Sequence, residues 1–383
     1  MYYCHQLRKV KVCLYGNNGR DYYNYLVTID DIENEVVDLY AKAVGVNDDR
    51  GMVVDLESTN PDGWSLQNRP ILKKATDAII YEIHIRDFSI DENSGVSIDY
   101  KGKYRGMCEK ATKLLNSNIR TGIDYLKELG INVLHLLQVF DYKSIDESKL
   151  EYHHYNLGYD PQNYNVPEGA YSSDPFNAKV RIREFKDMIR NFHNLGINMV
   201  MDVVYNHTTD TENSNFNYIV PGYYYRKNDH GTFSNASQCG NEIASERYMV
   251  RKFIVNSLCY WTKEYKIDGF RFDLMGIHDI ETMKIIRRKL YEIDKSISNK
   301  AWANEPYQTI TYTSSHDNYT LWDKLNISTQ NETKENRVKM NKLAAAIILT
   351  SQGIPFIYVG YELLRIKKRI DGTLEENSYN SPR

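Results

Sequence analysis

Residues 265–275 read YKIDGFRFDLM and join an apolar run to two charged side chains. The run has the composition of a short buried parallel strand, and Arg271 and Asp273 are two positions apart, so both leave the same face of an extended chain. A guanidinium beside a carboxylate lowers the pKa of that carboxylate and keeps it ionised. An ionised carboxylate at a strand end can act as a nucleophile or a charge stabiliser, although an ordinary structural ion pair remains the alternative.

Two other motifs carry chemistry at the ends of apolar runs. DVVYNH contributes Asp202, Asn206 and His207, and YTSSHDN contributes His316 and Asp317. Carboxylates and imidazoles around one rim could bind a metal ion or a sugar. A single histidine is more often structural, but the joint appearance of these residues at successive strand ends favours a binding or catalytic site. A metal-dependent hydrolase stays open as a third reading, although the sequence has neither HxH nor HExxH spacing.

The elements that position these residues repeat as helix followed by strand. Nearly continuous apolar strands are expected near residues 78–85, 131–139, 197–205, 267–270 and 354–359, with helices at 121–130, 180–195, 246–265, 279–293 and 336–351. This order predicts a parallel α/β sheet covered on both faces. The reactive residues, Asp141 among them, follow strand ends, as in a barrel or a doubly wound sheet. No glycine-rich phosphate loop follows a strand, which favours the barrel.

The first 70 residues differ from the rest. Residues 10–15 and 22–28 alternate apolar and polar side chains like two half-buried strands of a hairpin. Two strands cannot form a stable domain alone. Residues 47–64 hold turn signals typical of a linker. We therefore expect a β segment with a linker at 1–70 and a barrel domain at 71–383.

The motifs together resemble a known family. DVVYNH, GFRFDLM and SSHDN are similar to three of the four signature regions of the α-amylase superfamily, glycoside hydrolase family 13. YNLGYDP, at residues 155–161, resembles the YNWGYDP motif of type I pullulanases, which cut α-1,6 bonds in pullulan and related α-glucans. The resemblance implies a (β/α)8 TIM-barrel-type catalytic domain. It also implies that residues 1–70 are the remnant of an immunoglobulin-like starch-binding module of carbohydrate-binding module family 48.

The resemblance further implies a role for each matched residue in a retaining, double-displacement debranching hydrolase. Asp273 matches the nucleophile, Arg271 its positioning partner and Asp317 the transition-state stabiliser. The residues that match sugar-binding or supporting positions are Tyr159, whose ring stacks beneath the sugar, Asp160 beside it, the hydrogen-bonding pair His207 and His316, and the supporting residues Asp202 and Asn206. An oxocarbenium-like transition state needs such anions together with a separate acid that protonates the leaving oxygen.

The family's general acid has no counterpart in this sequence. It is the Glu of a GEGW-like segment after the fifth strand, and no such segment occurs here. His316 lies only 43 residues after Asp273, whereas one strand–helix–strand crossover takes about 30 residues or more. We therefore expect strands five and six to be missing, with a deletion between about residues 294 and 306. Glu305 is the one carboxylate near this gap, and it has no apolar strand before it.

Several smaller departures accompany the gap. Leu157 replaces the Trp of the motif, Gln138 stands where the family has Pro, and the sequence ends soon after the eighth strand, so we expect truncated ends. Loss of the acid predicts impaired turnover. The alternative is a non-catalytic protein that binds α-glucans.

Composition limits the partners and the compartment. The chain has 383 residues and a formal net charge of −3, which argues against nucleic acid as the main partner. It contains no run of 18 apolar residues and no signal-peptide h-region, so neither a membrane span nor secretion is expected. Five scattered cysteines fit a reducing compartment. We expect a cytoplasmic monomer that acts on α-glucans and needs no cofactor; the sequence leaves a structural calcium ion open.

Overall fold

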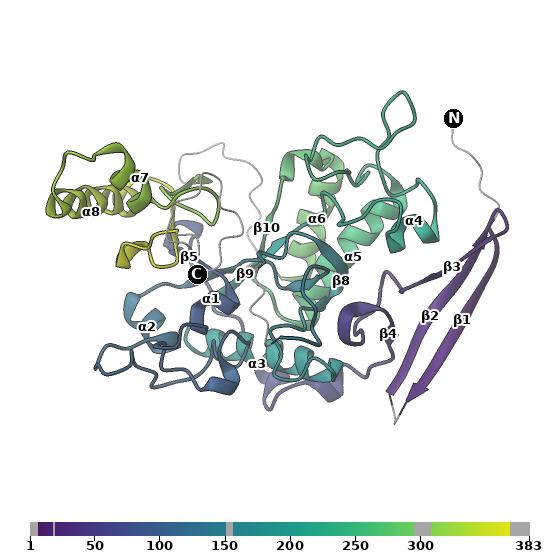
Figure 1. Ribbon diagram of the computed structural model, residues 1–383, viewed down its shortest axis with the longest axis horizontal. Helices are drawn as coiled ribbons and strands as arrows, with labels where there is room; N and C mark the ends of the chain where they lie inside the picture. The colour runs from purple at the N-terminus through teal and green to yellow at the C-terminus, as the bar shows by residue number, and fades with distance from the viewer. Residues whose placement is uncertain (1–6, 18–19, 151–155, 295–307, 368–383) are drawn as a thin grey trace.

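The computed structural model describes residues 7–17, 20–150, 156–294 and 308–367, and its centre is a parallel sheet (Figure 1). The sheet has six strands in the order β10-β9-β6-β5-β12-β11, and every neighbouring pair runs parallel. The strands are β5 (Ile80–Ile83), β6 (Val133–Leu136), β9 (Asn198–Val203), β10 (Gly269–Phe272), β11 (Ile310–Thr311) and β12 (Ile354–Tyr358). This sheet and its helices form a partial (β/α)8 fold.

Helices alternate with these strands, which confirms the predicted repeat. The helices that match the predicted ones are α2 (Gly122–Leu129), α3 (Ala178–Asn194), α5 (Tyr248–Glu264), α6 (Ile280–Ile293) and α8 (Lys334–Thr350). Shorter ones are α1 (Ile85–Ser89), α4 (Asn215–Ile219) and α7 (Leu321–Ser328). Figure 1 shows α7 and α8 at the end of the molecule opposite the N-terminal strands. No helix of the described residues is both long and apolar enough to span a bilayer.

Helix α3 forms because its apolar residues recur at helical spacing and all reach the core. Ile182, Phe185, Ile189 and Phe192 are fully buried, and Gly196 follows the helix with a φ of 79°, a conformation that suits glycine. Helix α2 begins after Thr121 as expected, but the Thr121 side chain makes no capping bond. Its hydroxyl donates instead to the Ser94 carbonyl at 2.6 Å.

The strand expected near residues 131–139 is shorter than predicted, and a second strand follows it just beyond that range. β6 ends at Leu136, and a separate strand, β7 (Phe140–Tyr142), pairs antiparallel with β8 (Pro161–Pro167). A continuous apolar run could not reveal this break, because every residue of both strands is buried. The break has a consequence for the site, because Asp141 lies in β7 and not at the end of a strand of the main sheet.

The N-terminal segment is an antiparallel sheet of four strands. It contains β1 (Leu7–Asn17), β2 (Arg20–Ile29), β3 (Ile32–Val36) and β4 (Gly51–Met52), and β2 pairs with each of the other three. Figure 1 shows β1 and β2 as a long hairpin at one end of the molecule. The two expected strands are therefore present, with two further ones. That this sheet is the remnant of a starch-binding module stays a prediction.

The stretch predicted as a linker packs against the barrel. Met52 and Trp64 are buried in the same apolar core as the main sheet. Lys186 of α3 donates to the Leu56 carbonyl at 3.2 Å, and Lys266 donates to the Gln67 carbonyl at 2.8 Å. The turn signals in this stretch mark short 3-10 helices rather than a free chain. A domain boundary near residue 70 stays a prediction.

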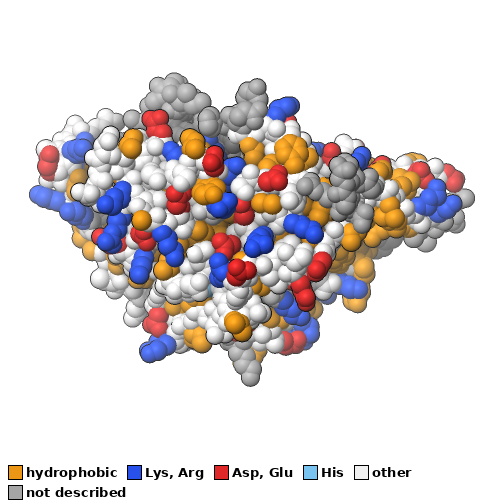
Figure 2. Space-filling view, turned by 90° about the horizontal axis from the view of Figure 1, so that it is seen from below, with side chains coloured by type: hydrophobic (Ala, Val, Ile, Leu, Met, Phe, Trp, Pro, Cys, Tyr) orange, Lys and Arg blue, Asp and Glu red, His pale blue; other side chains and the backbone are white. Residues whose placement is uncertain are grey.

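Opposite charges alternate on the face of the molecule in Figure 2. Lys and Arg side chains are interspersed there with Asp and Glu, without a broad area of one sign. A nucleic-acid-binding face would show clustered basic residues. This face therefore has no such character.

The Phe185 ring gives a direct test of the core. It packs against Tyr104, Trp261 and Tyr265, with ring centroids 5.2, 6.0 and 5.4 Å away. We expect Phe185→Ala to lower the free energy of unfolding by about 3–5 kcal/mol, because it leaves a cavity among rigid rings. Urea unfolding followed by tryptophan fluorescence measures this loss. The matched control is Phe176→Ala, at a ring 53% exposed, with an expected loss below about 1 kcal/mol. Equal losses in both variants would contradict this view of the core.

Candidate functional site

The carboxyl ends of β9 and β10 place one arginine between two aspartates. The strands pair with Arg271 opposite Asp202. Nη1 of Arg271 donates to both carboxylate oxygens of Asp202, at 3.0 and 2.9 Å, and to Oδ1 of Asp273 at 3.2 Å. The contact expected between Arg271 and Asp273 is therefore present, and a second carboxylate shares the guanidinium.

The loop after β9 fixes the other oxygen of Asp273. Nδ2 of Asn206 donates to Oδ2 of Asp273 at 3.0 Å. With Arg271 on Oδ1 and Asn206 on Oδ2, the carboxylate has little freedom to rotate. His207, the next residue, is buried and places its Nε2 2.9 Å from the Tyr159 carbonyl oxygen.

Tyr159 connects this group to the segment after β11. Its hydroxyl donates to Oδ2 of Asp202 at 2.7 Å and lies 3.0 Å from Nε2 of His316. The Tyr159 and His316 rings are stacked, with centroids 5.3 Å apart and planes 16° apart. Nε2 of His316 is also 3.5 Å from Oδ1 of Asp317, whose side chain is 42% exposed. A continuous series of polar contacts thus runs from Asp273 to Asp317.

Two buried residues that sequence reasoning missed, Glu82 and His135, contact His316 and Asp202. Oε1 of Glu82 lies 2.8 Å from Nδ1 of His316, and Oε2 accepts the His316 backbone N–H at 2.8 Å. His135 lies 3.6 Å from Glu82 and 3.6 Å from Asp202. Each is a charged or polar residue inside an apolar strand, β5 or β6, and that contrast was the available signal.

Two other predictions, one for Asp160 and one for the region around Glu305, have different outcomes. The side chain of Asp160 does not join the group, because its carboxylate lies against Ser144 in the loop after β7. Glu305, and most of the proposed deletion between residues 294 and 306, fall outside the described residues. The described positions therefore leave the general acid untested.

Comparison with known proteins agrees with this arrangement. A family model described as "Alpha amylase, catalytic domain" matches residues 117–220. The pullulanase of Bacillus subtilis (strain 168) is 36% identical over 422 aligned positions, which cover 91% of this chain and 57% of the relative. Chloroplastic pullulanase 1 of Arabidopsis thaliana is 28% identical, with 90% of this chain and 51% of the relative covered.

Solved structures agree more closely. Pullulanase from Paenibacillus barengoltzii, crystallised with maltohexaose and α-cyclodextrin, is 42% identical with a TM-score of 0.89, covering 94% of this chain and 67% of that one. The chain belongs to the pullulanase family of α-amylase-type glycoside hydrolases. Pullulanase from Anoxybacillus sp. LM18-11, crystallised with maltotetraose, has a TM-score of 0.87 at 39% identity and covers 95% of this chain and 62% of that one. This chain spans about half the length of the curated pullulanases that it matches.

The electrostatics of the site correct one expectation about this pullulanase-family chain. Burial raises the pKa of Asp273 above its ordinary value, and the neighbouring Asp202 adds to the rise, while Arg271 and Asn206 oppose it. The sequence predicted that Arg271 would lower the pKa of Asp273. Arg271 does act in that direction, but burial and the neighbouring Asp202 outweigh it, so the net pKa of Asp273 is raised instead of lowered. Asp202 behaves in the opposite way: burial raises its pKa, but His135 and Arg271 outweigh burial and leave it lowered.

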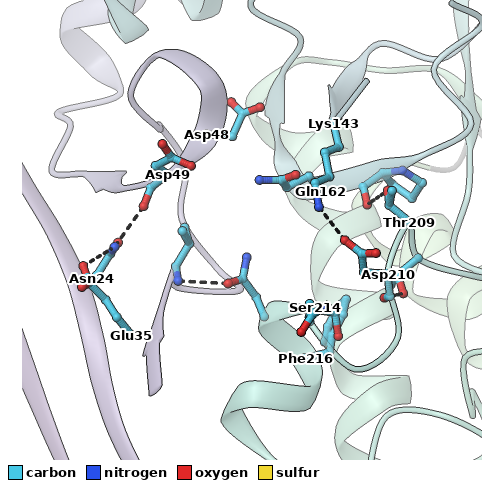
Figure 3. Close-up of a pocket in the computed structure, with 15 residues that line it drawn as sticks. Asn24, Glu35, Asp48, Asp49, Lys143, Gln162, Thr209, Asp210, Ser214 and Phe216 are labelled. Carbon is cyan, nitrogen blue, oxygen red and sulfur yellow. Dashed lines mark hydrogen bonds and ion pairs between the residues drawn. The ribbon is translucent and has the colours of Figure 1, made fainter. Parts of the chain in front are cut away.

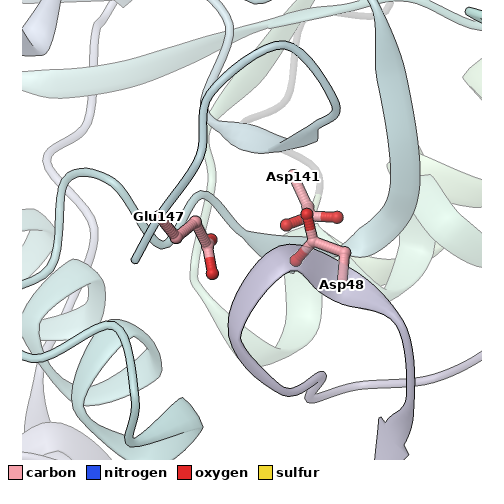
Figure 4. A group of neighbouring side chains, drawn as sticks. All are labelled: Asp48, Asp141 and Glu147. Atoms are coloured by element: carbon pink, nitrogen blue, oxygen red, sulfur yellow. The ribbon is translucent and has the colours of Figure 1, made fainter. Parts of the chain in front are cut away.

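Asp141 lies in a second, separate cluster of carboxylates (Figure 4). The expectation that it belongs to the reactive rim was wrong, because it sits in β7 and packs against Asp48 and Glu147. Carboxylate oxygens of these three buried residues lie within 4.8 Å of one another. The Arg181 guanidinium lies among them, 3.6 Å from Asp48, 3.4 Å from Asp141 and 2.6 Å from Glu147. These residues do not fit a calcium ion, because an arginine already provides the cation.

A pocket of about 210 Å³ lies between the N-terminal sheet and the loop after β9 (Figure 3). Asn24 and Glu35 line it from the sheet, and Lys143 and Asp210 face them from the barrel side. None of the predicted site residues lines this pocket. It is therefore a polar gap between the two sheets and not the sugar site.

The Glu82–His316 pair predicts a pH-dependent contribution to stability. Burial opposes the charge on each residue, but their mutual attraction leaves the pKa of Glu82 below 4.5 and the pKa of His316 above 6.5. The contribution of His316 is complete below pH 6.5 and is lost as pH rises through its raised pKa. The contribution of Glu82 is complete above pH 4.5 and is lost as pH falls through its lowered pKa.

We therefore expect Glu82→Gln to lower the free energy of unfolding most between pH 4.5 and 6.5, by about 3 kcal/mol, and less on either side. Denaturant unfolding across this pH range measures the difference from the wild type. Glu92→Gln, at an exposed loop position, is the control and should give no pH-dependent difference. A difference that is constant from acid to alkaline pH would refute the ion pair.

Proposed function

We propose that this chain is a debranching glycoside hydrolase of the pullulanase type, which binds α-glucans and attacks α-1,6 bonds by a retaining mechanism. The observation that carries the proposal is the unbroken polar series from Asp273 through Arg271 and Asp202 to Tyr159 and His316. Such a series holds a nucleophile, a buried charge network and a sugar-facing ring in one place. Crystallised relatives with maltohexaose and maltotetraose support an α-glucan as the ligand.

The proposed roles follow from the resemblance to the α-amylase superfamily, and the geometry of the site is compatible with them. An oxygen of Asp273 forms a bond to the anomeric carbon of the glucosyl unit, and the bond from that carbon to the leaving oxygen breaks. Water then cleaves the glycosyl ester and restores the carboxylate. Asp317, at the exposed end of the series, would stabilise the positive charge that develops on the sugar ring. Tyr159 supplies the stacking surface, and His207 and His316 supply hydrogen bonds to the sugar.

The missing general acid limits this reaction. We propose that strands five and six of the barrel are absent, together with the acid that follows the fifth strand. Three observations support this: β10 and β11 are the outer strands of the sheet among the described residues, His316 follows Asp273 by only 43 residues, and the alignment with the Bacillus subtilis relative is longer than this chain. Without an acid the leaving oxygen departs unprotonated, which costs on the order of 10²–10⁴-fold in rate.

A non-catalytic α-glucan-binding protein is the second candidate. It is favoured by one observation, that the residues proposed to hold sugar are assembled among the described residues while no acid is placed beside them.

Calcium is part of neither proposal, because Arg181 occupies the acidic cluster. We expect the melting temperature to stay the same when EDTA is added, and a fall of several degrees that calcium reverses would show that a metal binds after all.

Binding and turnover measured side by side separate the two candidates. We expect calorimetry to show that the purified chain binds maltotetraose. We also expect release of reducing ends from pullulan to be about 10²–10⁴-fold slower than with the Bacillus subtilis pullulanase. Asp273→Asn should abolish the residual turnover and keep the binding. Binding with no turnover above that of Asp273→Asn would favour the non-catalytic candidate, and the absence of binding would reject both.

Tyr159 gives the sharpest test of the sugar site. Tyr159→Ala removes the stacking surface and the link between Asp202 and His316, so we expect maltotetraose binding to weaken about tenfold, or ~1.4 kcal/mol. The matched control is Tyr248→Ala, at an exposed ring at the start of α5, which should bind like the wild type. If both variants bind equally well, the sugar does not lie on Tyr159.

A further inference from the structure

The segment that carries His316 and Asp317 has little support from the sheet. β11 contributes only Ile310 and Thr311, and these pair on one side, with Ile354 and Pro355 of β12. On its other side no strand of the described residues pairs with β11. A two-residue edge strand cannot by itself fix a loop that starts several residues later, so other contacts must position His316.

Two buried charged side chains hold the His316 backbone from opposite ends. Its N–H donates to Oε2 of Glu82 at 2.8 Å, and its carbonyl accepts a hydrogen bond from Nζ of Lys367. Glu82 belongs to β5, and Lys367 lies in the segment after β12, the strand that pairs with β5. Both side chains are almost completely buried.

Lys367 is itself held in place. Its backbone N–H donates to Oδ2 of Asp323 at 3.0 Å, and Nζ lies 5.5 Å from the centre of the Tyr358 ring. Burial lowers the pKa of Lys367 to about 8, while Asp317, Glu82 and Asp323 oppose the fall and Lys324 adds to it. Burying an ammonium group is costly unless it is hydrogen-bonded. The hydrogen bond from the buried Lys367 ammonium to the His316 carbonyl oxygen therefore indicates a specific structural role.

We propose that Lys367 is a positioning residue that holds the His316 peptide so that the His316 imidazole stays on Glu82 and Tyr159 and the Asp317 carboxylate faces the sugar. The proposal rests on the proposed sugar site for its functional meaning. Its structural part, the placement of His316, is testable without any ligand. Sequence reasoning missed Lys367, which stands in a run of basic residues that reads as a solvated surface.

The sign of one pKa change separates positioning from simple electrostatics. The attraction of Glu82 opposes burial and raises the pKa of His316. If Lys367 were only a nearby positive charge, replacing it by a neutral residue would raise the pKa of His316 further. If Lys367 positions His316, its loss loosens the contact with Glu82, and the pKa of His316 falls toward its ordinary value.

The experiment compares Lys367→Met and Lys367→Arg with the matched control Lys324→Met, which alters an exposed lysine in the same neighbourhood. NMR titration of the histidine rings in the ligand-free chain, assigned with His316→Asn, reports the pKa of His316. Calorimetry reports the affinity for maltotetraose, and thermal unfolding reports stability. We expect Lys367→Met to lower the pKa of His316 and to weaken maltotetraose binding about tenfold. Lys367→Arg and Lys324→Met should stay within about threefold of the wild type.

A rise in the pKa of His316 in Lys367→Met, or no change, overturns the proposal, as does binding equal to that of the wild type. If the wild type itself does not bind maltotetraose, the proposed function fails, and the titration still decides the role of Lys367. If Lys367→Met does not fold, Lys367→Gln replaces it, because the shorter neutral amide cannot restore the charged contact and the same fall in pKa is expected.

Discussion

The charge balance around Asp202 is the interaction on which the site depends. This carboxylate is fully buried, and it is stable there only because Arg271, Tyr159 and His135 surround it. A buried ion pair that loses one partner leaves an uncompensated charge, which is strongly destabilising. The arginine in turn donates to two carboxylates, and this helps to fix where Asp273 lies. The geometry of the Asp273 carboxylate therefore depends on a neighbour that does not touch the sugar in the proposed mechanism.

The pairing of the outer strands is the second constraint. Among the described residues β10 and β11 are the outer strands of the main sheet, and both carry residues of the site or lead to them. The β10 side is secured by long pairing with β9, where four residues are in register. On the β11 side only two residues pair with β12. The position of His316 there depends on two buried side chains, Glu82 of β5 and Lys367 of the segment after β12. The two halves of the site are thus held by different physical means.

The N-terminal segment is joined to the barrel through charge as well as through apolar packing. Asp48 from this segment meets Asp141, Glu147 and Arg181 of the barrel. Burial raises the pKa of Asp48 and of Asp141 well above the ordinary value, while Arg181 opposes the rise. The cluster thereby links the N-terminal segment to the loop after β7.

The sequence alone determined the repeat of strand and helix, the parallel sheet, the helical core face of α3 and the set of residues at the strand ends. These depend on local periodicity and on motif spacing, which a single chain displays directly. Only the tertiary structure decided that Asp141 faces away from the site, that Asp160 lies against Ser144, and that burial outweighs Arg271 at Asp273. It also decided the roles of Glu82 and Lys367, which lie 285 positions apart along the chain and meet at one peptide. The physical reason is that desolvation and shared counter-charges depend on every neighbour in space, and spacing along the sequence does not encode those neighbours.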